Sequence, residues 1–387
     1  MSELHISPVK NEADMMDFIS LPWEVYRDNP YWVPPLVSER RDFHNKDKNP
    51  FFEHATVAYF IARRGGKVVG TIASFTNEKY NEFQDLNTGF FGFFEVLDDE
   101  EAAAALLRAA ENWAKEAGHD TILGPAQFST NDEVGLLVDS FDDAPRVLMT
   151  YNPPRYMDYI EQAGFQKAMD LWAFALQIED FMQNIPPKLL RVVEKIKKRH
   201  KFEIRPLNMR DFDHEVELFK RVYNKSWERN WGFVPMTDAE INHLAQELKQ
   251  IIDPDLAFMV EQDGEVVGVS LSLPDLCQPL LSAYPNPGTP NWLSMLKLVW
   301  HWKVLPLFSP DSRLKWLRVF ALGVMPEFRG SGVDALMYIE TAKVAAAKGY
   351  KRVEMSWILE NNDMMNRSIR LLGGEVYKTY RMYGKPL

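Results

Sequence analysis

The chain has 387 residues, of which 46% are hydrophobic, and 44 basic against 55 acidic side chains give a formal net charge of -11. The length predicts about two domains, and the acidic balance argues against a nucleic-acid surface, so no DNA partner is expected. Cys277 is the single cysteine and cannot form an intrachain disulfide. No signal peptide, membrane-length apolar run or Cys/His cluster occurs, which favours a cytoplasmic protein without an integral membrane segment or a metal site.

The first half of the chain predicts a hairpin followed by a helix and further strands. Residues 58–70 are an apolar run, a charged glycine turn and a second apolar run, which is typical of a β-hairpin. Residues 98–118 are rich in alanine and end in glycine, as a helix C-terminus prefers. A strand is expected at 121–124. Polar and aromatic loops at 128–133 and 151–152 either line a substrate cavity or are structural.

The second half repeats this order of elements. Residues 257–268 match the hairpin at 58–70, and residues 330–349 match the alanine-rich helix, again ending in glycine. In each half a strand, a short helix, a glycine and a last strand follow. We therefore expect two similar α/β domains, residues 1–185 and residues 201–387, joined by a charged linker helix at 186–200.

A glycine-rich turn, Arg329-Gly-Ser-Gly332, separates a predicted strand at 317–324 from the helix of the second half. Glycines let the backbone turn sharply, and the free N–H groups that begin a helix favour an anion such as a phosphate. An ordinary strand-to-helix turn explains the same residues. The run from Gly330 also fits Gly-x-Gly-x-x-Ala, the dinucleotide fingerprint, although too few residues follow it for a doubly wound sheet.

The order of elements in residues 201–387, with VMPEFRGSGVDAL after the fourth strand and ENNDMMNRSIRLLGG after the fifth, resembles the GNAT acyltransferase family. The whole chain is similar to a widespread bacterial group of tandem GNAT-like proteins. This resemblance implies an α/β fold of two GNAT-like domains, each a mixed, mostly antiparallel sheet flanked by helices. It also implies acetyl-CoA as co-substrate and no metal.

The resemblance assigns the cofactor to residues of the second domain. The family binds pantetheine and pyrophosphate through the fourth strand and a Gln/Arg-x-x-Gly-x-Gly/Ala loop, and Glu327 here departs from its first position. The residues expected to contact CoA are Val324, Arg329, Gly330, Ser331, Gly332, Val333 and Asn362. In the first domain, residues 95–101 carry five carboxylates and no glycine, so we expect a degenerate copy that binds no CoA.

Acyl transfer to an amine requires a base for the ammonium and an acid for the departing thiolate. Glu354 and Glu360, near the end of the fifth strand, are the candidate bases. Glu360 is preferred because it lies at the strand-to-helix junction, although an acid there also suits a helix start. The family's usual tyrosine acid is replaced by Ile369. Tyr383 is the candidate acid, with Tyr377 and Tyr380 as alternatives, and aromatic residues on a strand also serve packing.

The segment between the first two helices of the second domain usually recognises the acceptor in this family. Trp227, Asn230 and Trp231 are the candidates, and a domain-interface cluster is the equal alternative. The expected activity is acetyl transfer from acetyl-CoA to the amine of a small molecule or peptide. A non-catalytic acyl-CoA sensor and an aminoacyl-tRNA-dependent transferase remain alternatives, and the sequence does not indicate an oligomeric state.

Overall fold

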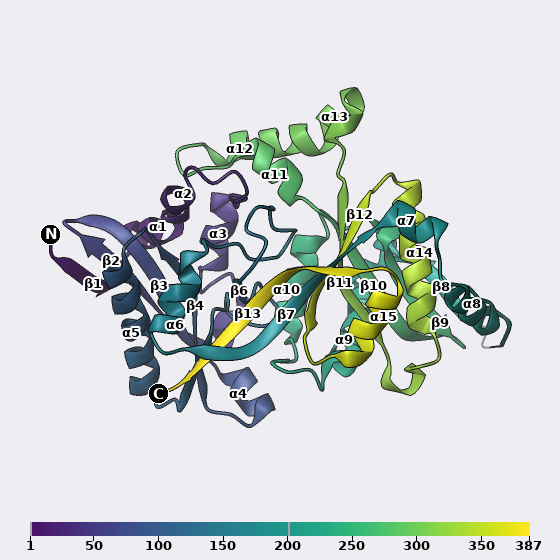
Figure 1. Ribbon diagram of the computed structural model, residues 1–387, viewed down its shortest axis with the longest axis horizontal. Coiled ribbons are helices and arrows are strands. Elements are labelled where there is room, and N and C mark those ends of the chain that lie inside the picture. Colours follow the sequence, from purple (N-terminus) through teal and green to yellow (C-terminus); the bar gives the residue numbers. More distant parts are fainter. Residues whose placement is uncertain (1, 200–201) are drawn as a thin grey trace. The chain divides into compact units, whose positions relative to one another are not determined.

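The computed structural model describes residues 2–199 and 202–387, which form two compact units that are each discontinuous in sequence (Figure 1). Unit 1 contains the described residues up to Leu171, together with Cys277–Ser312 and Lys378–Leu387. Unit 2 contains Trp172–Leu276 and Arg313–Tyr377. The domain boundaries expected from the repeat, 1–185 and 201–387, follow chain order and stay a prediction.

The sheet of unit 1 is mixed and mostly antiparallel. Its strand order is β1 (Leu4–Pro8), β2 (Ala55–Arg64), β3 (Lys67–Asn77), β4 (Thr88–Val96), β5 (Thr121–Gly124) and the end of β13 (Glu375–Pro386). Only the β4–β5 pair among these neighbours is parallel, and β13 pairs antiparallel to β5 with Tyr383 opposite Gly124. The short strand β6 (Leu136–Leu137) also pairs with β13. The final residues of the chain thus complete the sheet of unit 1.

Helix α5 (Glu100–Glu116) packs an apolar face against the sheet of unit 1. Leu106 and Leu107 are fully buried in a core with Ile72 and Phe91 of the sheet. Asp99 caps the helix by accepting a hydrogen bond from the Ala102 backbone N–H at 3.0 Å. The other α-helices of unit 1 up to Leu171 are α1 (Glu12–Ser20), α2 (Pro22–Val25), α3 (Val37–Phe43), α4 (Glu78–Gln84) and α6 (Arg155–Gln162).

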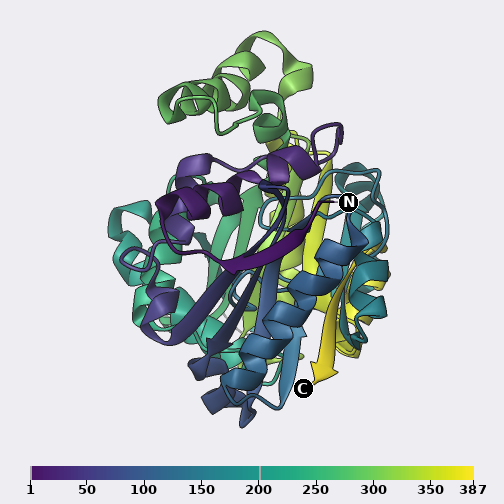
Figure 2. The ribbon, with the colours of Figure 1, turned by 90° about the vertical axis from the view of Figure 1, so that its left-hand side faces the viewer.

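Three helices inserted between strands of the second half belong to unit 1. These are α11 (Cys277–Ala283), α12 (Asn291–Val299) and α13 (Leu305–Phe308), with a π-helical turn before α13, and Figure 2 shows them standing away from the sheet of unit 1. Trp23 Nε1 donates to the Pro285 carbonyl at 2.7 Å and ties the insert to α2. Trp292 and Phe308 are 65% and 77% exposed. No helix of the described residues is long and apolar enough to cross a membrane.

The sheet of unit 2 has the same character. Its order is the end of β7 (Gln166–Gln177), then β12 (Arg352–Leu359), β11 (Trp316–Val324), β10 (Glu265–Pro274), β9 (Ala257–Gln262) and β8 (Glu203–Pro206). Strands β8 to β11 pair antiparallel, and β11 and β12 pair parallel. The mixed, mostly antiparallel sheets of both units confirm the predicted fold class.

Helices cover both faces of the unit 2 sheet. A Cβ at Gly268 of β10 would lie 2.9 Å from Val333 of α14 (Val333–Ala347), whereas the next residue, Val269, shares a core cluster with Val222 of α9 (Phe212–Trp227). Successive strand residues point to opposite faces, so α9 and α14 lie on opposite sides. The remaining helices are α7 (Ile178–Gln183) and α8 (Pro187–Arg199), which share a core with α14, α10 (Asp238–Leu248), and α15 (Asp363–Leu371).

Candidate functional site

The glycine-rich turn joins β11 to α14 as the sequence predicts. Gly330 has φ +75° and Gly332 φ +91°, a region that residues with a Cβ rarely adopt. Ser331 lies between them, and its Oγ accepts a hydrogen bond from the Val333 backbone N–H at 3.4 Å. Since Val333 begins a helix of 15 residues, the N–H groups that follow it in the first turn have no partner within the helix and are donors for an anion.

Helix α8 packs directly on this turn. A Cβ at Gly332 would lie 2.5 Å from Cδ1 of Ile196 and 2.5 Å from Cγ1 of Val192. Ile196 is 3% exposed and belongs to the same core cluster as Val333. Glycine is therefore required at position 332 for two reasons, the backbone conformation and the close approach of α8.

The C-terminal end of α9 lies against the end of β11. The Ser226 hydroxyl donates to the Val324 carbonyl at 3.1 Å, and Arg329 Nη2 donates to the Ser226 carbonyl at 2.7 Å. A Cβ at Gly323 would lie 2.6 Å from Cζ3 of Trp227, so the indole rests on the β11 backbone. The structure thus brings Trp227, from the predicted acceptor site, together with Val324 and Arg329 from the predicted cofactor site.

Asn230 and Trp231 form the turn that follows α9. The Asn230 backbone N–H donates to the Trp227 carbonyl at 2.8 Å, and the Asn230 carbonyl accepts from the Phe233 N–H at 3.2 Å. Both side chains are half-buried. These contacts fix the turn beside Trp227, and the role of the two side chains in acceptor binding stays a prediction.

Strands β11 and β12 pair over only part of their length. Their parallel register ends at Val319 opposite Met355, although both strands continue. In its pairing with β10, β11 contains a bulge at Phe320. Leu271 and Ser272 are consecutive in β10, but their partners in β11 are Ala321 and Val319, so Phe320 is the extra residue. Backbone N–H groups of β11 beyond the bulge lie outside the parallel ladder and could polarise a carbonyl.

A buried polar network holds the two strands together just before they separate. Arg318 and Glu354 are register partners, and they are 3% and 0% exposed. Arg318 Nε donates to Ser356 Oγ at 2.9 Å, and that hydroxyl donates to Glu354 Oε1 at 2.5 Å. The Tyr377 hydroxyl donates to the other carboxylate oxygen. Both Glu354 oxygens are engaged, so this carboxylate holds the strands in place. The sequence drew no attention to Arg318.

The residues predicted at the end of β12 share one edge of the sheet with the glycine turn, because β11 and β12 are parallel. Asn362 caps α15, its side chain accepting from the Met365 N–H at 3.3 Å. The Glu360 carbonyl accepts from Asn366 Nδ2 at 3.1 Å. Ile369 is 1% exposed and fills the core. The assignment of Glu360 as base and of Asn362 as a CoA contact stays a prediction.

Tyr383 lies in unit 1, on the part of β13 that pairs with β5. Its hydroxyl donates to Glu161 Oε1 at 3.0 Å. Burial, followed by the hydrogen bond to Glu161, raises the pKa of Tyr383 to about 12, so the phenol keeps its proton at neutral pH. Its role as the general acid stays a prediction.

Unit 1 contains a polar and aromatic cavity of about 840 Å³, counting the part open to solvent. Its lining includes Gln127, Glu133 and Tyr151, from the polar loops of the first half, and Glu95 from the end of β4. His44 also lines it, and burial, assisted by the charge of Arg40, lowers the pKa of His44 to about 3, so the imidazole is neutral.

Glu95 is a carboxyl group of this cavity with a strongly shifted pKa. Its Oε1 accepts from the Tyr26 hydroxyl at 3.1 Å and its Oε2 from the Tyr156 hydroxyl at 2.9 Å. Burial raises the pKa of Glu95 to about 8, although both hydrogen bonds and the charge of Arg155 act in the opposite direction. In the sequence, Glu95 belongs to the same acidic segment as residues 98–101. The structure gives its members different roles, because Glu95 lines the cavity and Asp99 caps α5.

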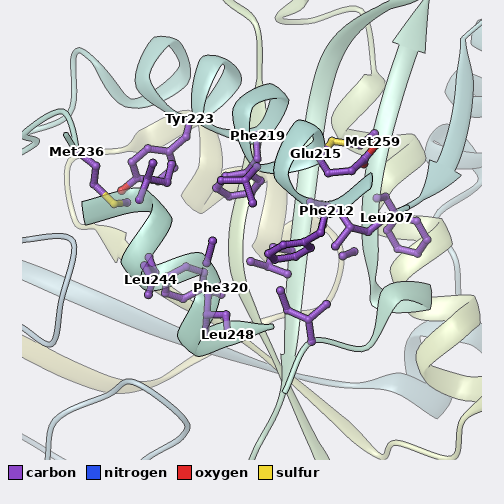
Figure 3. A pocket seen from close by; sticks show the side chains of 18 residues that line it. Leu207, Phe212, Glu215, Phe219, Tyr223, Met236, Leu244, Leu248, Met259 and Phe320 are labelled. Carbon is purple, nitrogen blue, oxygen red and sulfur yellow. The ribbon is translucent and has the colours of Figure 1, made fainter. Parts of the chain in front are cut away.

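A second pocket lies in unit 2, beneath α9 and α10 (Figure 3). It holds about 620 Å³ of space not filled by atoms, counting the part open to solvent. In Figure 3 the labelled side chains Phe212 and Phe219 of α9 face Leu244 and Leu248 of α10, with Phe320 of β11 among them. Sequence reasoning missed this pocket, because the apolar spacing of α9 and α10 is equally typical of a filled core.

Comparison with known proteins relates the chain to two proteins over nearly its whole length. No protein-family profile matches it. It is 36% identical over 391 residues to the bacterial ceramide synthase of Caulobacter vibrioides, covering 100% of this chain and 98% of that protein. It is 33% identical over 381 residues to protein YghO of Escherichia coli, covering 97% and 94%.

Solved structures show the fold. A tandem GNAT protein from the clavulanic acid biosynthesis pathway matches with a TM-score of 0.54 and 12% identity, covering 99% of this chain and 98% of that one. A GCN5-related glucosamine N-acetyltransferase region of a fungal multi-domain protein matches with a TM-score of 0.56 and 13% identity, over 100% of this chain and 38% of that one. The resemblance to tandem GNAT-like proteins is thereby confirmed at the level of fold.

Proposed function

Because the chain belongs to the family of the bacterial ceramide synthase of Caulobacter vibrioides and of YghO of Escherichia coli, we propose that it is an acyl-CoA-dependent N-acyltransferase. A ceramide is the amide of a fatty acid and a long-chain amino alcohol. We therefore propose a fatty acyl donor and a long-chain amine acceptor. The acetyl donor and the small or peptide amine expected from the sequence remain the alternative, since the glycine turn suits any CoA ester.

The observation that carries the proposal is the arrangement at the carboxyl end of β11. The glycine turn offers the N–H groups that begin α14, and the strand pairing with β12 stops at Val319. We propose that the turn holds the CoA pyrophosphate, with added charge from Arg329, and that β11 beyond the bulge orients the thioester carbonyl. Trp227, against the same strand, would lie beside the acceptor.

The reaction moves the acyl group from sulfur to nitrogen. The amine nitrogen bonds to the thioester carbon, the carbon–sulfur bond breaks, and the sulfur leaves as a thiolate that takes up a proton. A base must remove the proton lost by the amine, and Glu360 at the end of β12 is the proposed base. Since Ile369 fills the family's acid position with a buried apolar side chain, we propose that water supplies the proton to sulfur.

The test measures free CoA thiol released by the purified full-length chain from acetyl-CoA, octanoyl-CoA and palmitoyl-CoA. Each donor is combined with a short amine or with the long-chain amino alcohol sphinganine. We expect release to require both substrates and to be fastest with palmitoyl-CoA and sphinganine. Release from acetyl-CoA alone among the donors would favour the alternative, and no release with any pair would refute the transferase.

The pyrophosphate assignment is tested by a matched pair of variants, Ser331→Glu and Ser331→Gln. The two side chains are nearly the same size, but only glutamate places a negative charge between the two glycines. We expect Ser331→Glu to weaken CoA binding at least tenfold relative to Ser331→Gln, and the difference to shrink at high salt. Equal affinities for the two variants would exclude the turn as the phosphate site.

A non-catalytic acyl-CoA sensor is the second candidate, and the buried Ile369 in the acid position favours it. A sensor would bind palmitoyl-CoA in a thermal-shift measurement and release no thiol with any amine. A gel shift with tRNA separates the remaining alternative, aminoacyl transfer from tRNA, because neither the transferase nor the sensor retains tRNA.

A further inference from the structure

We propose that the pocket beneath α9 and α10 holds the aliphatic chain of the acyl donor. This inference rests on the proposed function and deepens it, because it assigns one of the two hydrocarbon chains of the reaction to a place in unit 2. The pocket is independent of the glycine turn that would bind the CoA phosphates.

The chemistry of the lining fits a hydrocarbon. Side chains of α9 and α10 point into the space at helical spacing, at positions 212, 216, 219 and 223 of one helix and 241, 244, 245 and 248 of the other. All but Tyr223 are apolar. A pocket of this composition gains affinity mainly from buried methylene groups.

Glu215 is the charged side chain in the lining of the pocket, and it forms an ion pair with Arg205. Glu215 is 3% exposed, and its carboxylate lies 2.9 Å from Arg205 Nη1 in an ion pair. No lysine or arginine lines the pocket. A phosphate or a carboxylate would therefore enter without a partner, so the CoA nucleotide cannot be the occupant and an uncharged chain can.

The position of the pocket favours the donor chain over the acceptor chain. Phe320, which lines it, is the bulged residue of β11, next to the point where β11 and β12 stop pairing. This is the stretch proposed to orient the thioester carbonyl. A chain attached to that carbonyl would pass Phe320 and enter between α9 and the sheet.

The first experiment locates the chain in the unmodified full-length protein. Palmitoyl-CoA with a photoreactive diazirine near the end of the chain is bound, irradiated and mapped by peptide mass spectrometry. We expect adducts on α9, on α10 or on β9 and β10 facing them, which are displaced by excess palmitoyl-CoA. Displaceable adducts confined to other elements would overturn the assignment. Because no substitution is made, the result does not depend on the folding of a variant.

The second experiment fills the pocket with Ala245→Phe, on α10, and uses Ala346→Phe, on the exposed face of α14, as the matched control. Each buried methylene contributes about fourfold in affinity, so we expect the wild type to bind palmitoyl-CoA far more tightly than acetyl-CoA. Ala245→Phe should weaken the binding of palmitoyl-CoA at least tenfold and change the affinity for acetyl-CoA less than threefold. Ala346→Phe should change neither.

The outcomes separate the pocket from the function. If no CoA ester binds the wild type, the proposed function itself fails. If all chain lengths bind equally, the function stands and the pocket assignment is wrong. If Ala245→Phe raises only the KM of sphinganine and leaves palmitoyl-CoA affinity unchanged, the acceptor chain occupies the pocket and the assignment to the donor is overturned.

Discussion

Glu95 should make the protein less stable as the pH rises above the normal range of a carboxyl group. Its pKa is raised from 4.5 to about 8 by burial in unit 1. Below pH 4.5 the group is protonated in both the folded and the unfolded chain, and its full contribution to stability is present. Between pH 4.5 and 8 the unfolded chain loses the proton and the folded chain keeps it. The free energy of unfolding therefore falls by up to about 1.4 kcal/mol per pH unit.

The magnitude follows from the two pKa values. Over the whole window the loss reaches about 5 kcal/mol, and between pH 5.5 and pH 8.5 it is about 3 kcal/mol. These are upper values, because Glu95 lines a cavity that solvent enters. Glu95→Gln removes the titration and keeps an oxygen that can accept from a tyrosine hydroxyl. We expect the variant to lose less stability than the wild type as the pH rises.

The assay is urea unfolding of the full-length wild type and of Glu95→Gln at pH 5.5 and pH 8.5. The control is Glu116→Gln, which removes an exposed carboxylate from α5. The difference in free energy of unfolding between the wild type and Glu95→Gln should change by about 1 to 3 kcal/mol between the two pH values. The free energy of unfolding of Glu116→Gln should follow that of the wild type at both pH values. A change below about 0.5 kcal/mol for Glu95→Gln would refute the claim that this carboxyl group is held protonated.

Three further substitutions test the architecture of unit 2 by urea unfolding. Gly332→Val combines a strained φ with a clash against α8, so we expect its free energy of unfolding to fall by more than about 2 kcal/mol. Gly330→Ala has open space around its Cβ, and its free energy of unfolding should fall by about 1 kcal/mol. Equal losses would mean that α8 moves to accommodate the added side chain. Arg318→Met leaves Glu354 buried without its cation and should lose about 3 to 5 kcal/mol. Stability within 1 kcal/mol of the wild type would show that the hydroxyl partners suffice.

The sequence predicted those features that depend on local pattern. The hairpin at 58–70 appears as β2 and β3, and the glycine turn appears with Gly330 and Gly332 at positive φ, because turn geometry is decided by a few neighbouring residues. A helix, α8 (Pro187–Arg199), covers most of the segment 186–200 in which the sequence predicts a linker helix, and its role as a linker stays a prediction. Its packing on Gly332 is a contact between distant residues, which periodicity does not reveal.

The pocket and the buried carboxyl groups were not predictable from pattern. Phe219 and Leu244 lie at core-facing positions, and their spacing is the same whether the opposite helix fills the space or leaves it open. Only the three-dimensional fit of side chains decides that. Glu95 and Asp99 belong to one acidic run, yet Glu95 faces a cavity and Asp99 caps a helix. A carboxyl group's environment depends on which distant residues reach it, here Tyr26 and Tyr156.

The placement of Lys378–Leu387 in unit 1 has a consequence for how the protein is made. The first 171 residues leave the ribosome long before Lys378–Leu387 are synthesised. Until then the edge of β5 that pairs with β13 in the finished sheet has no partner strand. An unpaired strand edge is prone to wrong pairing. Unit 1 therefore reaches its final form only late in translation, so ribosome-bound chains that stop before residue 378 should be more sensitive to proteases in unit 1 than chains that extend to residue 387.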